Sequence, residues 1–331
     1  MSNLNANFGP FGRPVNESVI GRAGGPGGTH LPDRWKMKAR LISSLLLLLL
    51  GMCGPAFAQD GKTATFTAGS IAQTSKQAAS DIEDIGEIDE QGGSTSLREK
   101  LRFSVDFRTA YTTNALLDGN NNHSDALFLP TIDAGFHTAL DKHFNFDLDT
   151  KVESAIYSRF QDRGFFGYDV LSTLDYHIQP GLPRFYASIE NYLYDTFSTG
   201  HLQTEAVGFT GGTDYGIAFN GGRTLGFAGY SFSDYLADPQ IDTRLVHRVV
   251  AGFAHQIRSN LTAQLYYVYQ YSNYTEFARS DSKNTVSGAL IYQFNEHWFG
   301  SLTTSYIDQG STQPHASYQS FSTALGLSLH F

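Results

Sequence analysis

Apolar and polar residues alternate with a period of two from Leu101 to the C-terminus. In the run 101–111, every second residue from Leu101 to Phe107 is apolar, and the residues between them are polar or charged. Strict alternation is typical of a β-strand that has one apolar and one polar face. The pattern therefore predicts a β-sheet protein in which the two faces of each strand meet different surroundings.

About a dozen such runs are present, each roughly twice as long as the five or six residues usual for soluble strands. They lie near residues 101–111, 127–140, 144–159, 168–178, 184–195, 205–219, 223–236, 244–257, 261–274, 285–294, 298–309 and 318–331. Membrane-spanning strands need about 9–11 residues, and a charged inner face suits a water-filled lumen. The sequence predicts an all-β fold, a transmembrane antiparallel up-and-down β-barrel of about 12 strands over 101–331, with ten or fourteen strands as the alternatives. The runs 223–236 and 244–257 alternate less regularly, which predicts a β-bulge there.

Tight turns alternate with longer polar connections between these runs. The tight turns are 141–143, 179–182, 221–222, 258–260 and 295–297, and the longer connections include 112–126 and 276–283. Outer-membrane barrels have short periplasmic turns and longer extracellular loops. An even number of strands then places both ends of the barrel on the periplasmic side. The last run is expected to pair with the first, because lipid offers no partner to an open sheet edge.

The final run ends the chain on an aromatic residue. Its apolar residues alternate back from the C-terminus as Phe321, Leu325, Leu327, Leu329 and Phe331. This segment resembles the C-terminal assembly signal of bacterial outer-membrane β-barrel proteins, a class that includes the porins. The resemblance covers 101–331 in pattern and only the last strand in motif. It implies a barrel surrounded by outer-membrane lipid and inserted by the barrel-assembly machinery.

The polar face of the runs carries charges of both signs. The residues predicted to line the lumen are Arg102, Asp106, Arg108, Asp133, His137, Asp147, Asp149, Lys151, Glu153, Arg159, Asp169, Asp175 and His177, followed by Arg184, Glu190, Asp214 and Arg248. Such a lining either filters solutes by charge in an open pore or forms a salt-bridged network that fills a narrow barrel. If the pore is open, its net acidic lining favours cations over anions.

The inward face of the run 205–219 differs from the others because it is rich in glycine. Gly208, Gly212 and Gly216 alternate with Thr210 and Asp214. Small residues leave room for a bulky group opposite them, which is a neighbouring side chain, the N-terminal tail or a solute. Local packing by a neighbouring side chain is the default interpretation.

Residues 37–58 have the three parts of a secretory signal peptide. Basic residues flank Met37, the run 41–50 is mostly apolar, and Ala56 and Ala58 form an A-x-A end, so cleavage is expected before Gln59. The apolar run is too short for a transmembrane helix, which needs about 20 residues. A lipoprotein signal at Cys53 is the alternative. We interpret residues 1–36 as an upstream extension that is not part of the gene product.

Residues 59–100 have a different composition from the barrel. They are rich in Gln, Ser, Thr, Ala and Gly and contain the acidic patch 81–90. We expect a disordered acidic periplasmic tail, with a plug in the lumen or a partner-binding helix as the alternative. Without residues 1–58, the chain has 17 basic and 30 acidic residues, which argues against nucleic acid as a partner.

The sequence offers little evidence of catalysis, metal binding or a cofactor. His315-Ala316-Ser317 is the only His-x-Ser sequence, and no Asn follows it on the last strand, where a lipid hydrolase of the barrel type would need its orienting group. We expect a protein without enzymatic activity, metal or cofactor. The leading hypothesis is a porin-like channel for small solutes. The alternatives are a non-conducting structural or assembly barrel accessory to envelope polysaccharide export and, third, an outer-membrane lipid hydrolase.

Overall fold

The computed structural model describes most of the chain from Leu101 onward. The described residues are 65–66, 90–91, 101–115, 117, 123–161, 164–178, 182–196, 202–276, 278–314 and 316–331. The predicted signal peptide, its cleavage site at Ala56, Ala58 and Gln59, and most of the predicted tail lie outside these residues. Within them, no helix is long and apolar enough to cross a membrane.

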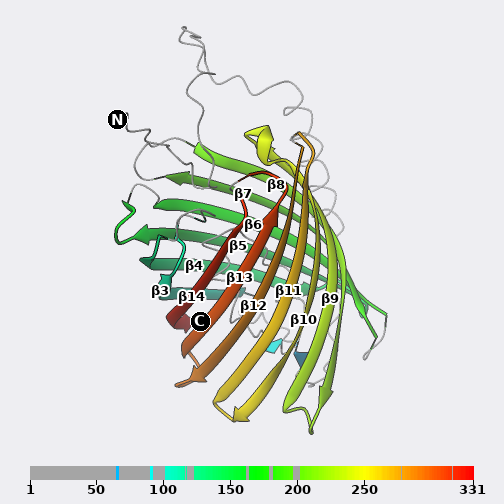
Figure 1. Cartoon of the computed structure of the whole chain (residues 1–331). Coiled ribbons are helices and arrows are strands. Elements are labelled where there is room, and N and C mark those ends of the chain that lie inside the picture. Colours follow the sequence, from blue (N-terminus) through cyan, green and yellow to red (C-terminus); the bar gives the residue numbers. More distant parts are fainter. Residues whose placement is uncertain are drawn as a thin grey trace, which may run out of the picture. The chain divides into compact units, whose positions relative to one another are not determined.

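Twelve antiparallel strands form one closed barrel, in which each strand pairs with its neighbours in the sequence (Figure 1). The strands are β3 (Leu101–Thr112), β4 (Asp125–Ala139), β5 (Phe144–Tyr157), β6 (Phe165–His177), β7 (Arg184–Thr196), β8 (Leu202–Phe219), β9 (Thr224–Asp238), β10 (Arg244–Arg258), β11 (Leu261–Tyr274), β12 (Arg279–Gln293), β13 (Trp298–Ser311) and β14 (Tyr318–His330). β1 (Thr65–Phe66) and β2 (Glu90–Gln91) form a separate two-stranded sheet. The predicted twelve-stranded up-and-down barrel is confirmed.

The barrel closes where the last strand meets the first. β14 pairs with β3 from Ser322 opposite Thr112 to His330 opposite Ser104. The N–H of Phe331 then donates to the carbonyl of Phe103 at 2.9 Å, so the terminal residue extends the ladder. The Phe331 ring lies 5.8 Å from the Phe103 ring, between ring centroids. The first and last runs therefore pair as the sequence predicts.

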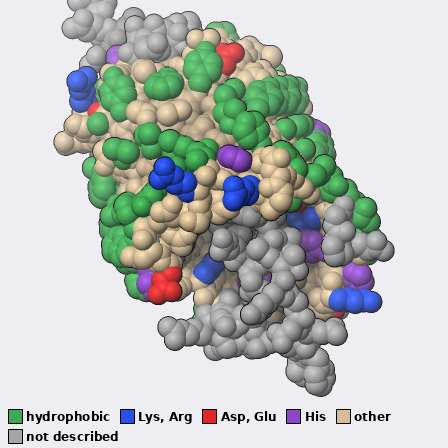
Figure 2. All heavy atoms as spheres, turned by 90° about the horizontal axis from the view of Figure 1, so that it is seen from below, with side chains coloured by type: hydrophobic (Ala, Val, Ile, Leu, Met, Phe, Trp, Pro, Cys, Tyr) green, Lys and Arg blue, Asp and Glu red, His purple; other side chains and the backbone are tan. Residues whose placement is uncertain are grey.

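Alternating exposure defines the two faces of the wall. Along β14, for example, Ser320, Ser322 and Ala324 are buried, while Phe321 and Leu325 are exposed. Large apolar side chains on every strand share the exposed, outward face, and Figure 2 shows hydrophobic side chains spread over the outside of the barrel. This band is the surface that lipid would cover, because a membrane barrel turns its apolar face outward.

Several expected strand limits differ from those of the structure, and the largest difference is at the start of β12. β12 begins at Arg279 rather than near 285, since Arg279 to Asn284 is polar on both faces and shows no apolar alternation. The run 144–159 ends instead at Tyr157. β9 and β10 pair in continuous register, so the irregularity predicted in the runs 223–236 and 244–257 is confined to the end of the second run. Register shifts lie between Gln256 and Arg258 in the β10–β11 pair and between Tyr194 and Asp195 in the β7–β8 pair.

The two ends of the barrel differ less in loop length than the sequence suggested. We call the end with the connections 140–143, 178–183, 220–223, 259–260 and 294–297 the turn side, and the other end the loop side. On the loop side only the connection 113–124 is long. β3 starts and β14 finishes on the turn side. In the β8–β9 turn, Asn220, Gly221 and Gly222 have positive φ angles, the region that glycine adopts without steric cost.

Two turns of the barrel have the same construction. Asp141 Oδ1 accepts the N–H groups of His143 and Phe144 at 2.6 and 2.8 Å. Eight strands further on, Asn295 Oδ1 accepts those of His297 and Trp298 at 2.9 and 3.0 Å. In both turns the histidine Nδ1 lies 2.8–2.9 Å from a carbonyl at the end of the next strand, His177 or His330. The side-chain acceptor fixes each turn in the manner of an Asx-turn.

Candidate functional site

The predicted lining residues lie on the inward face of the wall, with one exception. Those on strands occupy the positions that alternate with the exposed apolar residues. Arg159 instead lies beyond the end of β5, exposed, and its N–H donates to the carboxylate of Asp125 at 3.0 Å. It belongs to the loop side because its strand ends two residues earlier.

Charge on the inward face is divided between two halves of the barrel. Ten carboxylates and four basic residues face inward on the described parts of β3–β8: Asp106, Asp125, Asp133, Asp147, Asp149, Glu153, Asp169, Asp175, Glu190 and Asp214, with Arg102, Arg108, Lys151 and Arg184. On β9–β14 the charged inward positions are Arg244, Arg248, Arg279, Lys283 and Asp281. One half of the wall is therefore acidic and the other basic.

The acidic half is crossed by an ionic belt of hydrogen-bonded pairs. Arg102 Nη2 lies 2.5 Å from Asp149 Oδ1, and His137 Nδ1 lies 2.7 Å from Asp147 Oδ1. Arg184 lies 3.1 Å from Asp175 and also donates from Nε and Nη2 to Asp214, at 2.7 Å for the shorter bond. We define the ionic belt as Arg102, His137, Asp147, Asp149, Asp175, Arg184 and Asp214, on β3–β8.

One contact of the ionic belt reaches across a whole strand because an inward glycine lies between its partners. Arg102, Gly135 and Asp149 are in register on β3, β4 and β5, and a Cβ on Gly135 would overlap the Arg102 and Asp149 side chains. In the same way, Gly167 lies between Glu153 and Tyr194, whose hydroxyl donates to Glu153 at 2.7 Å. We call this arrangement a glycine clasp.

The predicted glycine-rich face of β8 contains two further clasps. Gly208 lies between Glu190 and Tyr235, and the Tyr235 hydroxyl donates to Glu190 at 3.1 Å. Gly212 lies beneath the Tyr186 ring, which extends toward Ser231. A Cβ on Gly216 would meet Leu225 at 3.3 Å. The bulky groups opposite these glycines are thus side chains of neighbouring strands.

The clasps occur on even-numbered strands. Gly252 on β10 lies between Phe227 and Tyr266, and Gly326 on β14 lies between Arg108 and Ser301. Together with Gly135, Gly167, Gly208 and Gly212, these glycines place a clasp on β4, β6, β8, β10 and β14. Of the even-numbered strands, β12 alone has no inward glycine in its described residues. Side chains of odd-numbered strands therefore flank a glycine on each even-numbered strand except β12, and across β4, β6 and β8 they are joined by a hydrogen bond.

An Arg–Tyr row lines the basic half near the loop side. Tyr235, Arg244, Tyr274 and Arg279 are in register on β9–β12. The Arg244 guanidinium lies 5.1 and 6.0 Å from the Tyr235 and Tyr274 ring centroids, and that of Arg279 lies 4.5 Å from Tyr274. These distances allow cation–π attraction. Arg279 also forms a bidentate ion pair with Asp281.

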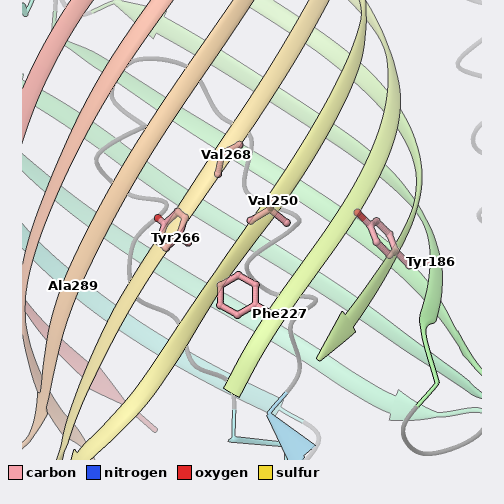
Figure 3. Packing of buried hydrophobic residues seen from close by; sticks show 6 residues of the cluster. All are labelled: Tyr186, Phe227, Val250, Tyr266, Val268 and Ala289. Atoms are coloured by element: carbon pink, nitrogen blue, oxygen red, sulfur yellow. The ribbon is translucent and has the colours of Figure 1, made fainter. Parts of the chain in front are cut away.

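An apolar patch lies below that row on the same half. Phe227, Val250, Tyr266, Val268 and Ala289 lie on β9–β12, with Tyr186 beside them, and Figure 3 shows their side chains on neighbouring strands. All are at most 6% exposed. The basic half of the inner surface thus also carries an apolar patch.

The third part of the lining is a row of small hydroxyl side chains. Ser287, Ser305, Ser322 and Thr112 are in register on β12, β13, β14 and β3, and we call them the hydroxyl row. Ser305 and Ser322 share a hydrogen bond at 2.6 Å. Tyr266 continues the row on β11. The sequence-based prediction missed this row and the Arg–Tyr row, because it selected charged residues and left out the hydroxyl and tyrosine side chains as well as Arg244 and Arg279. Serine or threonine at alternate positions of 301–305 was the available signal.

The remaining sequence-based candidates do not form a site here. His315 lies outside the described residues, and the Ser317 hydroxyl accepts the N–H of Ser311 at 2.9 Å, which is a loop contact. Among the described residues, no group of three or more His, Cys, Asp or Glu side chains could hold a metal ion.

The closed barrel, with its apolar outer band and polar lining, has the architecture of the transmembrane β-barrels of bacterial outer membranes. The family model for Putative beta-barrel porin 2 matches residues 225–331, which contain β9–β14 apart from the first residue of β9. No curated protein matches the sequence.

Solved structures resemble the chain in general shape. The KdgM porin is 11% identical, with 69% of this chain and 99% of that chain covered and a TM-score of 0.41. The translocator domain of the autotransporter NalP from Neisseria meningitidis is 11% identical, with 73% and 90% covered and a TM-score of 0.43. The COG4313 outer membrane channel from Pseudomonas putida F1 is 9% identical, with 70% and 95% covered and a TM-score of 0.46.

Proposed function

We propose that the protein is a porin-like channel that lets small solutes cross the outer membrane through the barrel lumen. One observation carries the proposal: twelve long strands close completely, and the inward face bears charged and hydroxyl side chains while the outward face is apolar. A wall of this kind satisfies every backbone hydrogen bond in lipid and offers solutes a polar path.

The lining also supports a preference between ions. Eleven carboxylates and eight basic residues face inward on the described strands, and most of the carboxylates are on β3–β8. A cleft lined by one sign of charge concentrates ions of the opposite sign. Cations are therefore expected to pass along the acidic half more readily than anions.

Conductance in planar bilayers tests the channel. The purified full chain should give steady single-channel steps, and the variant D147N/D149N/E153Q should show lower conductance and a reversal potential shifted away from cation preference. The matched control is D308N, because Asp308 is exposed on β13 and faces outward. A barrel that inserts into the bilayer but conducts no current would refute the channel. A reversal potential that is the same in the variant and the unchanged protein would refute the ion preference.

The alternative is a non-conducting structural or assembly barrel, accessory to envelope polysaccharide export. The burial of the charged lining favours this alternative, because side chains that are buried are not exposed to a water-filled lumen. The ionic-belt residues Asp147, Asp175, Arg184 and Asp214 are at most 8% exposed. A silent barrel whose deletion alters surface polysaccharide would support this alternative.

We further propose the route by which the chain reaches the membrane. The outward residues Phe321, Leu325, Leu327 and Leu329, with the terminal Phe331, are the surface offered to the barrel-assembly machinery. Cleavage after Ala58 would produce a mature chain that starts at Gln59. Intact-mass measurement of protein from the outer-membrane fraction tests this start, and an acylated N-terminal Cys53 would show the lipoprotein alternative instead.

A further inference from the structure

We propose that the hydroxyl row, together with Gln264 and Tyr266, is a binding subsite for an uncharged polyhydroxylated solute such as a saccharide unit. The inference rests on the proposed channel in one respect, because the solute is assumed to reach the subsite through the lumen. Its members lie on β11, β12, β13, β14 and β3, which are adjacent strands.

Two buried polar atoms point to a missing partner at this wall. Ser287 is 1% exposed and Gln264 is 6% exposed. No described residue forms a hydrogen bond with Ser287 Oγ or Gln264 Nε2. A buried donor or acceptor left unpaired costs about 1–3 kcal/mol. A solute hydroxyl, which both donates and accepts, would satisfy both atoms.

These two atoms belong to neighbouring positions. Gln264 lies opposite Ala289, and Ser287 lies opposite Tyr266, so the amide and the hydroxyl flank the Tyr266 position on two paired strands. An aromatic ring beside a few placed polar groups is the usual composition of a small-molecule site. In the proposed subsite the amide and the hydroxyls meet the O–H groups of a sugar, and the Tyr266 position lies between them.

The subsite lies where the inward side chains are short. The hydroxyl row consists of serine and threonine, and β12 is the even-numbered strand without a clasp among its described residues. On the opposite half, tyrosine and arginine side chains extend across neighbouring strands. A solute that passes through the barrel would meet the shortest inward side chains along β12–β14.

The absence of charge determines the class of solute. The described inward positions of β11, β13 and β14 carry no carboxylate, ammonium or guanidinium group. The nearest charged inward residues along β12 and β3 are Lys283 and Arg108, which lie four positions from Ser287 and Thr112. A charged solute would lose hydration there without gaining an ionic partner, which is costly. A neutral polyol exchanges hydrogen bonds with water for hydrogen bonds with Ser287 and Gln264, and its binding remains weak enough for release, as conduction requires.

Calorimetric titration of the purified full chain in detergent with maltotriose tests the subsite directly. S287V and Q264L should each weaken binding by roughly three- to tenfold, the effect of losing one hydrogen bond. T304V is the matched control, because Thr304 is exposed on the outer face of β13, next to Thr303. Its affinity should equal that of the unchanged protein. Glucuronate should bind more weakly than maltotriose.

Transient block of single-channel current by maltotriose gives the second measurement. Block that shortens in S287V and Q264L but not in T304V would support the subsite. Failure to bind maltotriose, or equal binding by S287V, Q264L and T304V, would overturn it while leaving a conducting channel intact. Binding that depends on Ser287 in a barrel that never conducts would support the subsite and refute the channel, so the two proposals fail separately.

Discussion

The hydroxyl of Tyr194 donates to the carboxylate of Glu153 at 2.7 Å, although their strands, β7 and β5, are not neighbours. The contact exists because Gly167 lies between them in register and has no side chain. Such a bond ties together strands that the main-chain ladder does not join. Gly167 therefore contributes to the inner packing of the barrel, because it leaves the space that the bond needs.

A side chain at Gly167 should therefore destabilise the barrel. In G167V the new Cβ would overlap the Tyr194 ring, and overpacking of this kind costs about 1–3 kcal/mol. Denaturant midpoints, followed by heat-modifiable mobility in gels, should decrease. G211V is the matched control, because Gly211 faces outward and no atom lies within 4 Å of its Cβ position. Equal midpoints for the two variants would contradict the role of the clasp.

Arg184 should be among the most sensitive positions of the ionic belt. It pairs with both Asp175 and Asp214, and all three side chains are at most 8% exposed. R184M leaves two buried carboxylates without their cation, a loss expected to cost about 3–5 kcal/mol. The triple variant D175N/R184M/D214N should recover much of that stability, because it removes the charges as well. If R184M unfolds at the same denaturant concentration as the unchanged protein, the pairing contributes nothing.

The turn at Asp141 should stabilise the barrel in a pH-dependent way. The N–H groups of His143 and Phe144 lower the pKa of the Asp141 carboxyl below its ordinary value of 3.8. A carboxyl whose pKa is lower in the folded state contributes stability above its unfolded pKa and loses it as pH falls through the folded pKa. D141A should therefore lower the unfolding midpoint at neutral pH, and the difference should shrink in strong acid.

The equivalent turn at Asn295 provides the control for this effect. Asn295 accepts the same two N–H groups without a titrating carboxyl. N295A should lower the midpoint by an amount that does not follow the Asp141 titration. A constant difference for D141A from neutral to strongly acidic pH would show that charge is unimportant in this turn.

Removal of Phe331 should impair closure and assembly. Its N–H extends the β14–β3 ladder, and its ring lies near Phe103 and His297. The truncated chain should accumulate less folded barrel in outer-membrane fractions, measured by heat-modifiable mobility. H330A, which leaves both the ladder carbonyl and Phe331 in place, should fold in normal amounts. Normal assembly of the truncated chain would remove the terminal aromatic residue from the proposed signal.

The alternation of apolar and polar residues predicted the barrel and its closure, because each strand needs an apolar face toward lipid and a polar face toward the lumen. It failed at Arg279, where the strand extends past the apolar band and both faces are polar. The charged lining was readable because acidic and basic residues stand out on an alternating run. The clasps could not be predicted, because the residues that meet across a glycine depend on the register of the strands on both sides. The pairing of Glu153 with Tyr194 depends on that register, and so does the position of Ser287 beside Tyr266.

The missing clasp at β12 has a mechanical consequence. A ring whose members are braced to their second neighbours resists changes of cross-section, and bending concentrates wherever the bracing stops. Side chains join β12 to each of its neighbours, but in the described residues no clasp joins β11 to β13 across it. The elastic compliance of the barrel should therefore be greatest at β12. Bending of the wall is therefore expected to begin on that side, while the braced half keeps its shape.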